Sequence, residues 1–176
     1  MTGKRSGKLA FCGVMTALAL VFLLLTLSPA ATVALAALAA VCGIPVVVEV
    51  GKRAALLHYG AVAVLALLLV PALEGKALYI AFFGWYTVFK AWLESKHLPR
   101  LPEYAAKLAI FTVAGLVAGA LLWKALLAPL SLAPWLYAVG VVAACGAFFL
   151  YDWGVTRLVS LYALRLHPPL SRLFRF

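Results

Sequence analysis

Six apolar segments follow one another along this chain, each close to the length of about 20 residues that a helix needs to cross a bilayer. Hydrophobic residues make up 67% of the chain and charged residues 11%, whereas soluble domains average about 45–50% and about 25%. A chain of 176 residues cannot enclose that much apolar surface in water, so the bilayer must be part of its solvent. We therefore expect an all-α integral membrane protein, a bundle of six transmembrane helices in a single membrane domain over residues 1–176. The expected spans are 9–27, 31–50, 54–72, 77–93, 105–127 and 134–156, and residues 157–176 are a basic helix end and tail.

Basic residues set the expected orientation of the bundle. The chain carries 15 Lys and Arg residues and a net charge of +10. With six spans both termini lie on one side, and all of these residues except Lys76 and Lys124 fall on that side. Because cytoplasmic loops are enriched in Lys and Arg, we place both termini in the cytoplasm of a multi-pass cell-membrane protein. The positive charge then sets the orientation of the helices in the membrane, so we expect the lipid bilayer as partner and no nucleic acid.

Several ionisable side chains fall inside the spans, where a charge at a helix centre costs about 2.5–3.5 kcal/mol to insert. In one interpretation they lie near the cytoplasmic interface, where the basic side chains reach water and the carboxylates pair with them. In the other, Glu49 or Asp152 faces Lys90 between helices, in a polar cluster that binds a polar ligand or docks a partner. The candidate residues of this polar cluster are Glu49, Lys90, Asp152 and Arg157.

The fourth span, 77–93, is unusually rich in aromatic residues, which recur along one side of the helix. Such side chains either face lipid and the interface or line a cavity for a flat apolar molecule. Gly84, in the same span, would bring a neighbouring helix or a ligand close to the backbone. Together with two tryptophans near the fifth and sixth spans, the candidate ligand-binding residues are Tyr79, Phe82, Phe83, Tyr86, Trp123 and Trp135.

Sequence motifs of enzymes and metal sites are missing from the chain. There is no G-x-x-x-x-G-K-[ST] loop for a nucleotide, no G-x-S-x-G and no H-E-x-x-H. The three cysteines, Cys12, Cys42 and Cys145, lie within apolar runs as small buried hydrophobes, and His58 has no second ligand at i+3 or i+4. We therefore expect no enzyme activity, no cofactor and no metal. Without a nucleotide-binding loop the chain could not energise transport by itself.

Small residues four apart occur in two spans, at Gly115 and Gly119 in the fifth and at Gly13 and Ala17 in the first. Such faces let another helix approach closely, so all four residues are candidate contacts for a partner helix. In size, layout and this first-helix spacing the chain resembles the substrate-binding subunits of energy-coupling-factor transporters, six-helix membrane proteins of Gram-positive bacteria. That family docks its transmembrane coupling subunit through such residues. The resemblance therefore implies a coupling subunit and a pair of ATPases as partners.

A second resemblance concerns the segments 82–86 with Lys90 and 151–153 with Arg157. They are similar to an uncharacterised group of small Firmicutes membrane proteins, and this likeness implies no activity. The outer turns depart from the transporter pattern, because they hold few polar groups and would suit an apolar ligand better than a charged vitamin.

Two hypotheses about function follow from these observations. In the first, the chain is the substrate-binding component of a small-molecule importer and binds a fairly apolar ligand among its helices. In the second, it is a non-transport interaction protein whose basic cytoplasmic face binds anionic lipid or a protein partner. Each basic residue near an anionic surface would contribute about 1 kcal/mol to such binding.

Overall fold

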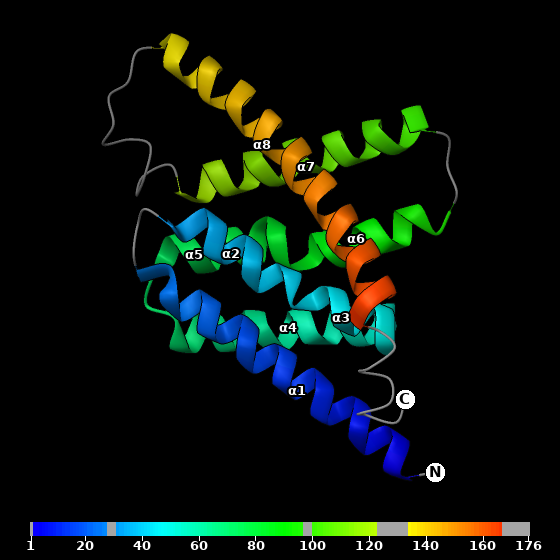
Figure 1. The fold of residues 1–176 in the computed structure, drawn as a ribbon. Helices are drawn as coiled ribbons and strands as arrows, with labels where there is room; N and C mark the ends of the chain where they lie inside the picture. The colour runs from blue at the N-terminus through cyan, green and yellow to red at the C-terminus, as the bar shows by residue number, and fades with distance from the viewer. Residues whose placement is uncertain (1, 28–30, 97–99, 123–133, 167–176) are drawn as a thin grey trace.

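The computed structural model describes residues 2–27, 31–96, 100–122 and 134–166, and within them all regular structure is helical (Figure 1). The side chains of 2–5, 100–103, 116–122, 134, 137–138 and 165–166 lie outside this description. The all-α prediction is therefore confirmed for the described part of the chain. The elements are α1 (Thr2–Leu24), η1 (Leu25–Leu27), α2 (Thr32–Val41), α3 (Gly43–Glu49), α4 (Lys52–Leu69), α5 (Leu73–Leu78), η3 (Tyr79–Phe83), α6 (Gly84–Glu94), α7 (Arg100–Leu122), α8 (Pro134–Leu161) and η6 (Tyr162–Leu166).

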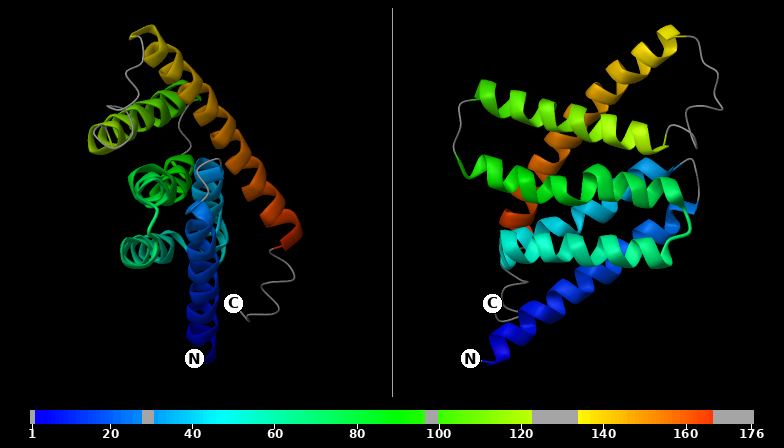
Figure 2. Two further views of the ribbon diagram at one scale, coloured as in Figure 1. Left: turned by 90° about the vertical axis from the view of Figure 1, so that its left-hand side faces the viewer. Right: turned by 180° about the vertical axis from the view of Figure 1, so that it is seen from behind.

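The helices form two layers that cross each other. One layer consists of α4, the continuous rod α5–η3–α6, and α7, which lie side by side (Figure 2). The other layer, α1, α2–α3 and α8, runs obliquely across it. Successive rods alternate in direction, so the start of α1, the turn from α3 to α4, the end of α6 and the end of α8 lie toward one end (Figure 1). A hydrogen bond of 2.7 Å from Lys52 Nζ to Ser95 Oγ joins two of these segments.

Four helices are long and apolar enough to cross a membrane among the described residues: Ser6–Leu27, Thr32–Glu49, Lys52–Leu69 and Val139–Leu164. The first three correspond to the expected spans 9–27, 31–50 and 54–72, and the fourth to 134–156. Two further expected spans are not among them. The helical rod that includes 77–93 contains Glu74, Lys76, Lys90 and Glu94, which lower its hydropathy. For 105–127, the described apolar stretch Tyr104–Gly115 is shorter than a span.

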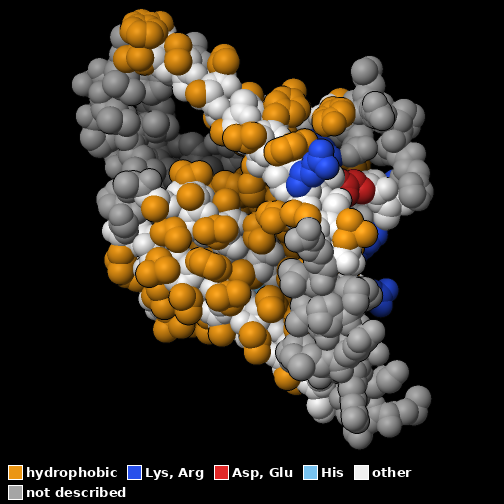
Figure 3. Space-filling model, in the orientation of Figure 1, with side chains coloured by type: hydrophobic (Ala, Val, Ile, Leu, Met, Phe, Trp, Pro, Cys, Tyr) orange, Lys and Arg blue, Asp and Glu red, His pale blue; other side chains and the backbone are white. Residues whose placement is uncertain are grey.

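The outside of the bundle is largely apolar. Many leucines and valines of α1, α4 and α8 are largely exposed, among them Leu57, Leu68 and Val142. In Figure 3 hydrophobic side chains cover most of the visible described surface, and the charged ones gather toward one end. Such a surface is unfavourable in water and favourable in lipid, which supports a membrane protein.

The second apolar segment is broken into two helices near its proline. A kink or an unwound turn is expected at Pro45, because proline has no N–H and cannot bond to the carbonyl four residues earlier. That carbonyl belongs to Val41, and α2 ends there. After a single non-helical residue, Cys42, α3 begins at Gly43. Chain direction then reverses through Gly51, whose φ of 109° is readily adopted by glycine.

The rod α5–η3–α6 is the centre of the bundle. Tyr79 and Tyr86 are almost completely buried in it, and Gly84 packs closely against Tyr59 of α4. A Cβ atom at Gly84 would lie 2.6 Å from Cδ2 of Tyr59. Of the two neighbours expected close to the backbone at Gly84, a helix or a ligand, the structure shows a helix, α4.

α8 rests on the bundle through one stripe of its surface. The buried residues of α8 and η6 are Phe148, Asp152, Val155 and Tyr162, which recur at helical spacing. In contrast, residues 139–144 at the other end of α8 are all exposed. α8 is thus held mainly along its second half.

Candidate functional site

A pocket of about 650 Å³ lies between the two layers, and we call it the aromatic pocket. Its walls come from α2, from α5 and η3, from α7 and from α8. Its lining combines alanines and Gly115 with the phenylalanines Phe82, Phe83, Phe111 and Phe148. Small-molecule sites typically enclose about 300–1,000 Å³ and are mostly apolar. The aromatic pocket therefore has the size and lining of a site for a small apolar molecule.

Phe82 organises the aromatic wall. Its ring centroid lies 5.4 Å from that of Phe111, 5.8 Å from that of Phe148 and 5.1 Å from that of Tyr86. Phe111 and Phe148 stack directly at 4.5 Å. Phe82 belongs to the π-helical turn η3, and such turns recur at functional sites because they redirect side chains. Ring pairs of this kind are rigid and favourable, which preserves the shape of the wall.

The predicted ligand-binding residues are only partly brought together here. Phe82 and Phe83 line the aromatic pocket, whereas Tyr79 and Tyr86 are buried in the core beside it. Trp135 is 65% exposed at the start of α8 and is not part of the lining. Trp123 lies outside the described residues.

Sequence reasoning missed the contribution of the later helices to this pocket. Phe111, Phe148 and Tyr151 come from α7 and α8. Each is an ordinary apolar position in its own span, and no local spacing links it to the fourth span. The only available signal was that aromatic residues also occur in these two segments.

A cluster of ionisable side chains joins α6, α7 and α8 next to the pocket, and we call it the Asp152 cluster. It consists of Tyr86, Lys90, Glu94, Lys107 and Asp152. Asp152 Oδ1 accepts hydrogen bonds from Lys90 and from the Tyr86 hydroxyl, the latter at 2.6 Å. Asp152 Oδ2 lies 3.3 Å from Lys107 Nζ. Glu94 completes the charge balance, with its Oε1 atom 3.1 Å from Lys90 Nζ and 3.6 Å from Lys107 Nζ.

Burial makes these ion pairs important for the position of α8. Lys90, Lys107 and Asp152 are 2%, 3% and 6% exposed. Two positive and two negative charges meet, so the formal sum over the four ionisable groups is zero. A buried charge is tolerated when it is paired and hydrogen-bonded, and it is costly when a partner is removed. The Asp152 cluster therefore fixes α8 against α6 and α7.

Two other predicted members of the polar cluster lie elsewhere. Glu49, at the end of α3, accepts a hydrogen bond of 2.9 Å from the Tyr162 hydroxyl. Arg157 is exposed, and its guanidinium lies 5.4 Å from the ring of Trp153. Thus the structure brings Lys90 and Asp152 together as one interpretation expected, and Lys107 takes the place given to Arg157.

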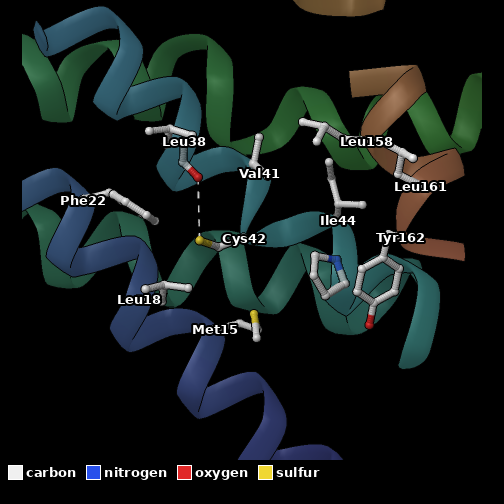
Figure 4. A pocket seen from close by; sticks show the side chains of 11 residues that line it. Met15, Leu18, Phe22, Leu38, Val41, Cys42, Ile44, Leu158, Leu161 and Tyr162 are labelled. Atoms are coloured by element: carbon white, nitrogen blue, oxygen red, sulfur yellow. Dashed lines mark hydrogen bonds between the residues drawn. The ribbon is translucent and has the colours of Figure 1, made fainter. Parts of the chain in front are cut away.

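A second apolar pocket, of about 610 Å³, lies between α1, α2–α3 and the end of α8 (Figure 4). Its two polar side-chain groups already have partners. The Cys42 thiol donates to the Leu38 carbonyl oxygen at 3.6 Å, and the Tyr162 hydroxyl donates to Glu49. Leu18 and Leu38, at its rim, are exposed to the surroundings of the bundle. We expect lipid chains to fill this pocket in a bilayer.

The predicted partner-helix contacts differ in their surroundings. Gly13 and Ala17 lie on an exposed part of α1, and a Cβ atom at Gly13 would have nothing within 4 Å. Gly115 lines the aromatic pocket, and Gly119 lies in α7. The Gly13 face is thus open to an approaching helix.

His58 is buried near α1, and its Nδ1 atom lies 2.9 Å from the Thr16 hydroxyl. Among the described residues, no group of three or more His, Cys, Asp and Glu side chains could hold a metal ion. The cysteines of this part of the chain form no disulfide, and Cys42 is buried.

No protein family, curated protein or solved structure matches this chain.

Proposed function

We propose that this chain is a multi-pass membrane protein that crosses the bilayer six times, with both termini in the cytoplasm. The support is the alternation of rod directions together with the gathering of charged side chains toward one end (Figures 1 and 3). The exposed basic residues Lys52, Arg53 and Lys96 belong to that end. The rod Leu73–Glu94 would then cross the membrane inside the bundle, where Lys76, Lys90 and Glu94 have protein partners.

Topology can be tested by cysteine labelling. In a variant whose three native cysteines are replaced by alanine, one new cysteine is placed at Lys52 or at Leu73, both exposed. We expect a membrane-impermeant maleimide to label Leu73→Cys in intact cells, and Lys52→Cys only after the membrane is permeabilised. Labelling of both positions from the same side would contradict six crossings.

The function that we propose is the binding of a small apolar molecule in the aromatic pocket, as the substrate-binding component of an importer. The aromatic pocket carries this proposal, because it combines a volume of about 650 Å³ with a rigid wall of rings. Its lining comes from helices of a membrane bundle, so an apolar molecule could reach it through lipid. A charged ligand would find no counter-charge among the described side chains that line it.

Filling the pocket tests this function. The probe is the flat hydrocarbon fluorene, and its binding to the protein in lipid nanodiscs is measured by equilibrium dialysis against empty nanodiscs. Ala147 lines the pocket, and Ala147→Phe would place a ring inside it. We expect the affinity for fluorene to fall by about tenfold or more, since about 1.4 kcal/mol of lost contact corresponds to that factor.

The matched control is Val142→Phe, on the exposed first half of the same helix. It adds a ring of the same kind toward lipid, so we expect unchanged binding. Equal affinities of the wild type, the Ala147 variant and the Val142 variant would refute the pocket as the binding site.

The transport assignment needs partners that this chain would meet through its membrane surface. The open face at Gly13 and Ala17 supports docking of a helix from a coupling subunit, which would in turn carry the ATPases. The alternative, a non-transport interaction protein, is favoured by the exposed basic residues at one end of the bundle. Co-purification with an ATPase pair would favour the first. Binding to anionic vesicles that weakens with salt, with no ATPase present, would favour the second.

A further inference from the structure

A third pocket, of about 560 Å³, lies between α1 and α4, and we call it the α1–α4 groove. It is lined by α1 from Lys8 to Thr16 and by α4 from Ala54 to Ala61, with Val50 just before α4. Leu9 and Leu57, which belong to this lining, are each 76% exposed. A Cβ atom at Gly13 would have nothing within 4 Å. The groove is therefore open to the surroundings of the bundle, which in a membrane are lipid.

The α1–α4 groove is apolar along its length and positively charged at one end. Lys8 is the one Lys or Arg residue among the described residues that line it, and no Asp or Glu is among them. Lys8 takes no part in the ion pairs of the described residues. Lys52 and Arg53, both exposed, directly precede the lining residue Ala54. The groove thus combines an apolar surface with positive charge that has no counter-charge in its lining.

The charged end of the groove lies at the cytoplasmic interface in the orientation that we propose. α1 and α4 both begin toward the end of the bundle where charged side chains gather (Figures 1 and 3). Along α1 the lining runs from Lys8 to Thr16, which is about 12 Å of helix. One leaflet is half of a hydrocarbon core of about 30 Å. A lipid of the cytoplasmic leaflet could therefore place its headgroup beside Lys8 and an acyl chain along the groove.

Charge decides between the possible occupants. A neutral helix of a partner would leave the ammonium group of Lys8 without a counter-charge beside an apolar surface, which is unfavourable. A second copy of this chain would bring a second Lys8 to the same face, because a symmetric interface uses the same surface on both subunits. An anionic lipid headgroup supplies the missing charge. The pocket between α1, α2–α3 and α8 differs, since no Lys or Arg is among its described lining residues.

We propose that the α1–α4 groove binds one anionic phospholipid of the cytoplasmic leaflet, whose phosphate pairs with Lys8 and whose acyl chain lies along Gly13 and Leu57. Basic pockets between transmembrane helices on the cytoplasmic side are typical sites for anionic headgroups. An acyl chain finds little advantage over bulk lipid in an apolar groove, because lipid tails are themselves apolar. The charge at Lys8 therefore provides the preference for this lipid. The inference is independent of the aromatic pocket and rests on the proposed orientation only for the choice of leaflet.

A pair of lipids that differ in headgroup charge tests this. The full chain is purified in detergent, and binding of dioleoylphosphatidylglycerol and of dioleoylphosphatidylcholine is measured by native mass spectrometry. We expect the first equivalent of the anionic lipid to bind about fivefold more tightly than the zwitterionic lipid. Lys8→Ala should remove this preference, since about 1 kcal/mol for one basic residue near an anionic surface corresponds to that factor. Lys8→Arg, which keeps the charge, should retain the preference.

The apolar part of the site is tested by filling the groove. Gly13→Leu would place a side chain in the open space beside α4, so we expect binding of the anionic lipid to fall about fivefold or more. The matched control is Gly140→Leu in α8, which is exposed and likewise has nothing within 4 Å of an added Cβ atom. It should leave lipid binding unchanged. Arg157→Ala, which removes an exposed positive charge outside the groove, should also leave it unchanged.

Each remaining outcome would overturn the inference. Equal binding of the two lipids to the wild type would show that the headgroup charge is not recognised. An equal loss in Arg157→Ala and Lys8→Ala would assign the binding to the basic end of the bundle as a whole. If Gly13→Leu binds the anionic lipid like the wild type but no longer co-purifies with an ATPase pair, the groove belongs to a partner helix. Binding of fluorene is measured separately, so failure of the aromatic pocket would leave this result unaffected.

Discussion

Replacing Asp152 by alanine is expected to be strongly destabilising. The substitution leaves the buried ammonium groups of Lys90 and Lys107 without their main counter-charge and removes the acceptor of the Tyr86 hydroxyl. Breaking a buried ion pair by removing one partner typically costs about 3–5 kcal/mol. We expect a large fall in melting temperature in detergent, with loss of the monodisperse peak in size-exclusion chromatography. Glu94, which is 40% exposed, cannot compensate for both lysines.

Two comparisons make this result specific to the cluster. Arg157→Ala removes a charge from the same helix at an exposed position and is expected to change stability little. Changing Lys90 and Lys107 to methionine together with Asp152→Leu should recover much of the lost stability, because apolar replacements of a buried charge group are often tolerated. If Asp152→Ala were as stable as Arg157→Ala, the cluster would have no role in holding α8.

Gly84→Ala is expected to destabilise the bundle, although alanine is the better helix former. Its Cβ atom would lie 2.6 Å from Cδ2 of Tyr59 and 2.7 Å from Cε1 of Tyr79. Neither ring can withdraw easily, since the Tyr59 hydroxyl bonds to the Ile80 carbonyl oxygen at 2.9 Å and Tyr79 is 1% exposed. Overpacking of a well-filled core costs about 1–3 kcal/mol. Thermal unfolding in detergent should therefore show a lower midpoint.

The matched control for this substitution is Gly60→Ala in α4. No atom lies within 4 Å of a Cβ built at Gly60. There the gain in helix propensity, about 0.8–1.0 kcal/mol, acts alone, so stability should rise or stay level. A change of the same sign and size at both glycines would show that the approach of α4 to Gly84 does not limit packing.

The helical character of the chain could be predicted from the sequence because each apolar run indicates a helix by itself, without knowledge of contacts to distant segments. The lengths of the runs locate α1, α4 and α8 well, and Pro45 explains why the second run divides at Cys42. The run 77–93 was harder to delimit. Its helix begins at Leu73, before the charged residues Glu74 and Lys76, because these remain helical at the end of the rod.

The sites depend on contacts between distant segments, which periodicity does not encode. Lys90 and Asp152 are 62 residues apart, and charge alone suggested their pairing. Charge gave no reason to prefer Lys107 over Arg157, since that choice depends on how α8 is rotated about its axis. The same rotation brings Phe148 and Tyr151 to the aromatic pocket.

The order in which ribosomes make the chain gives the Asp152 cluster a further consequence. Lys90 and Lys107 are synthesised 62 and 45 residues before Asp152. During that interval Glu94 is the one carboxylate of the cluster that exists. Asp152, in α8, therefore completes the neutralisation of charges that α6 and α7 already carry. A polypeptide truncated before Asp152 would hold two ammonium groups of the cluster against the single carboxylate of Glu94, an excess positive charge by which the cell could distinguish an unfinished product from a finished one.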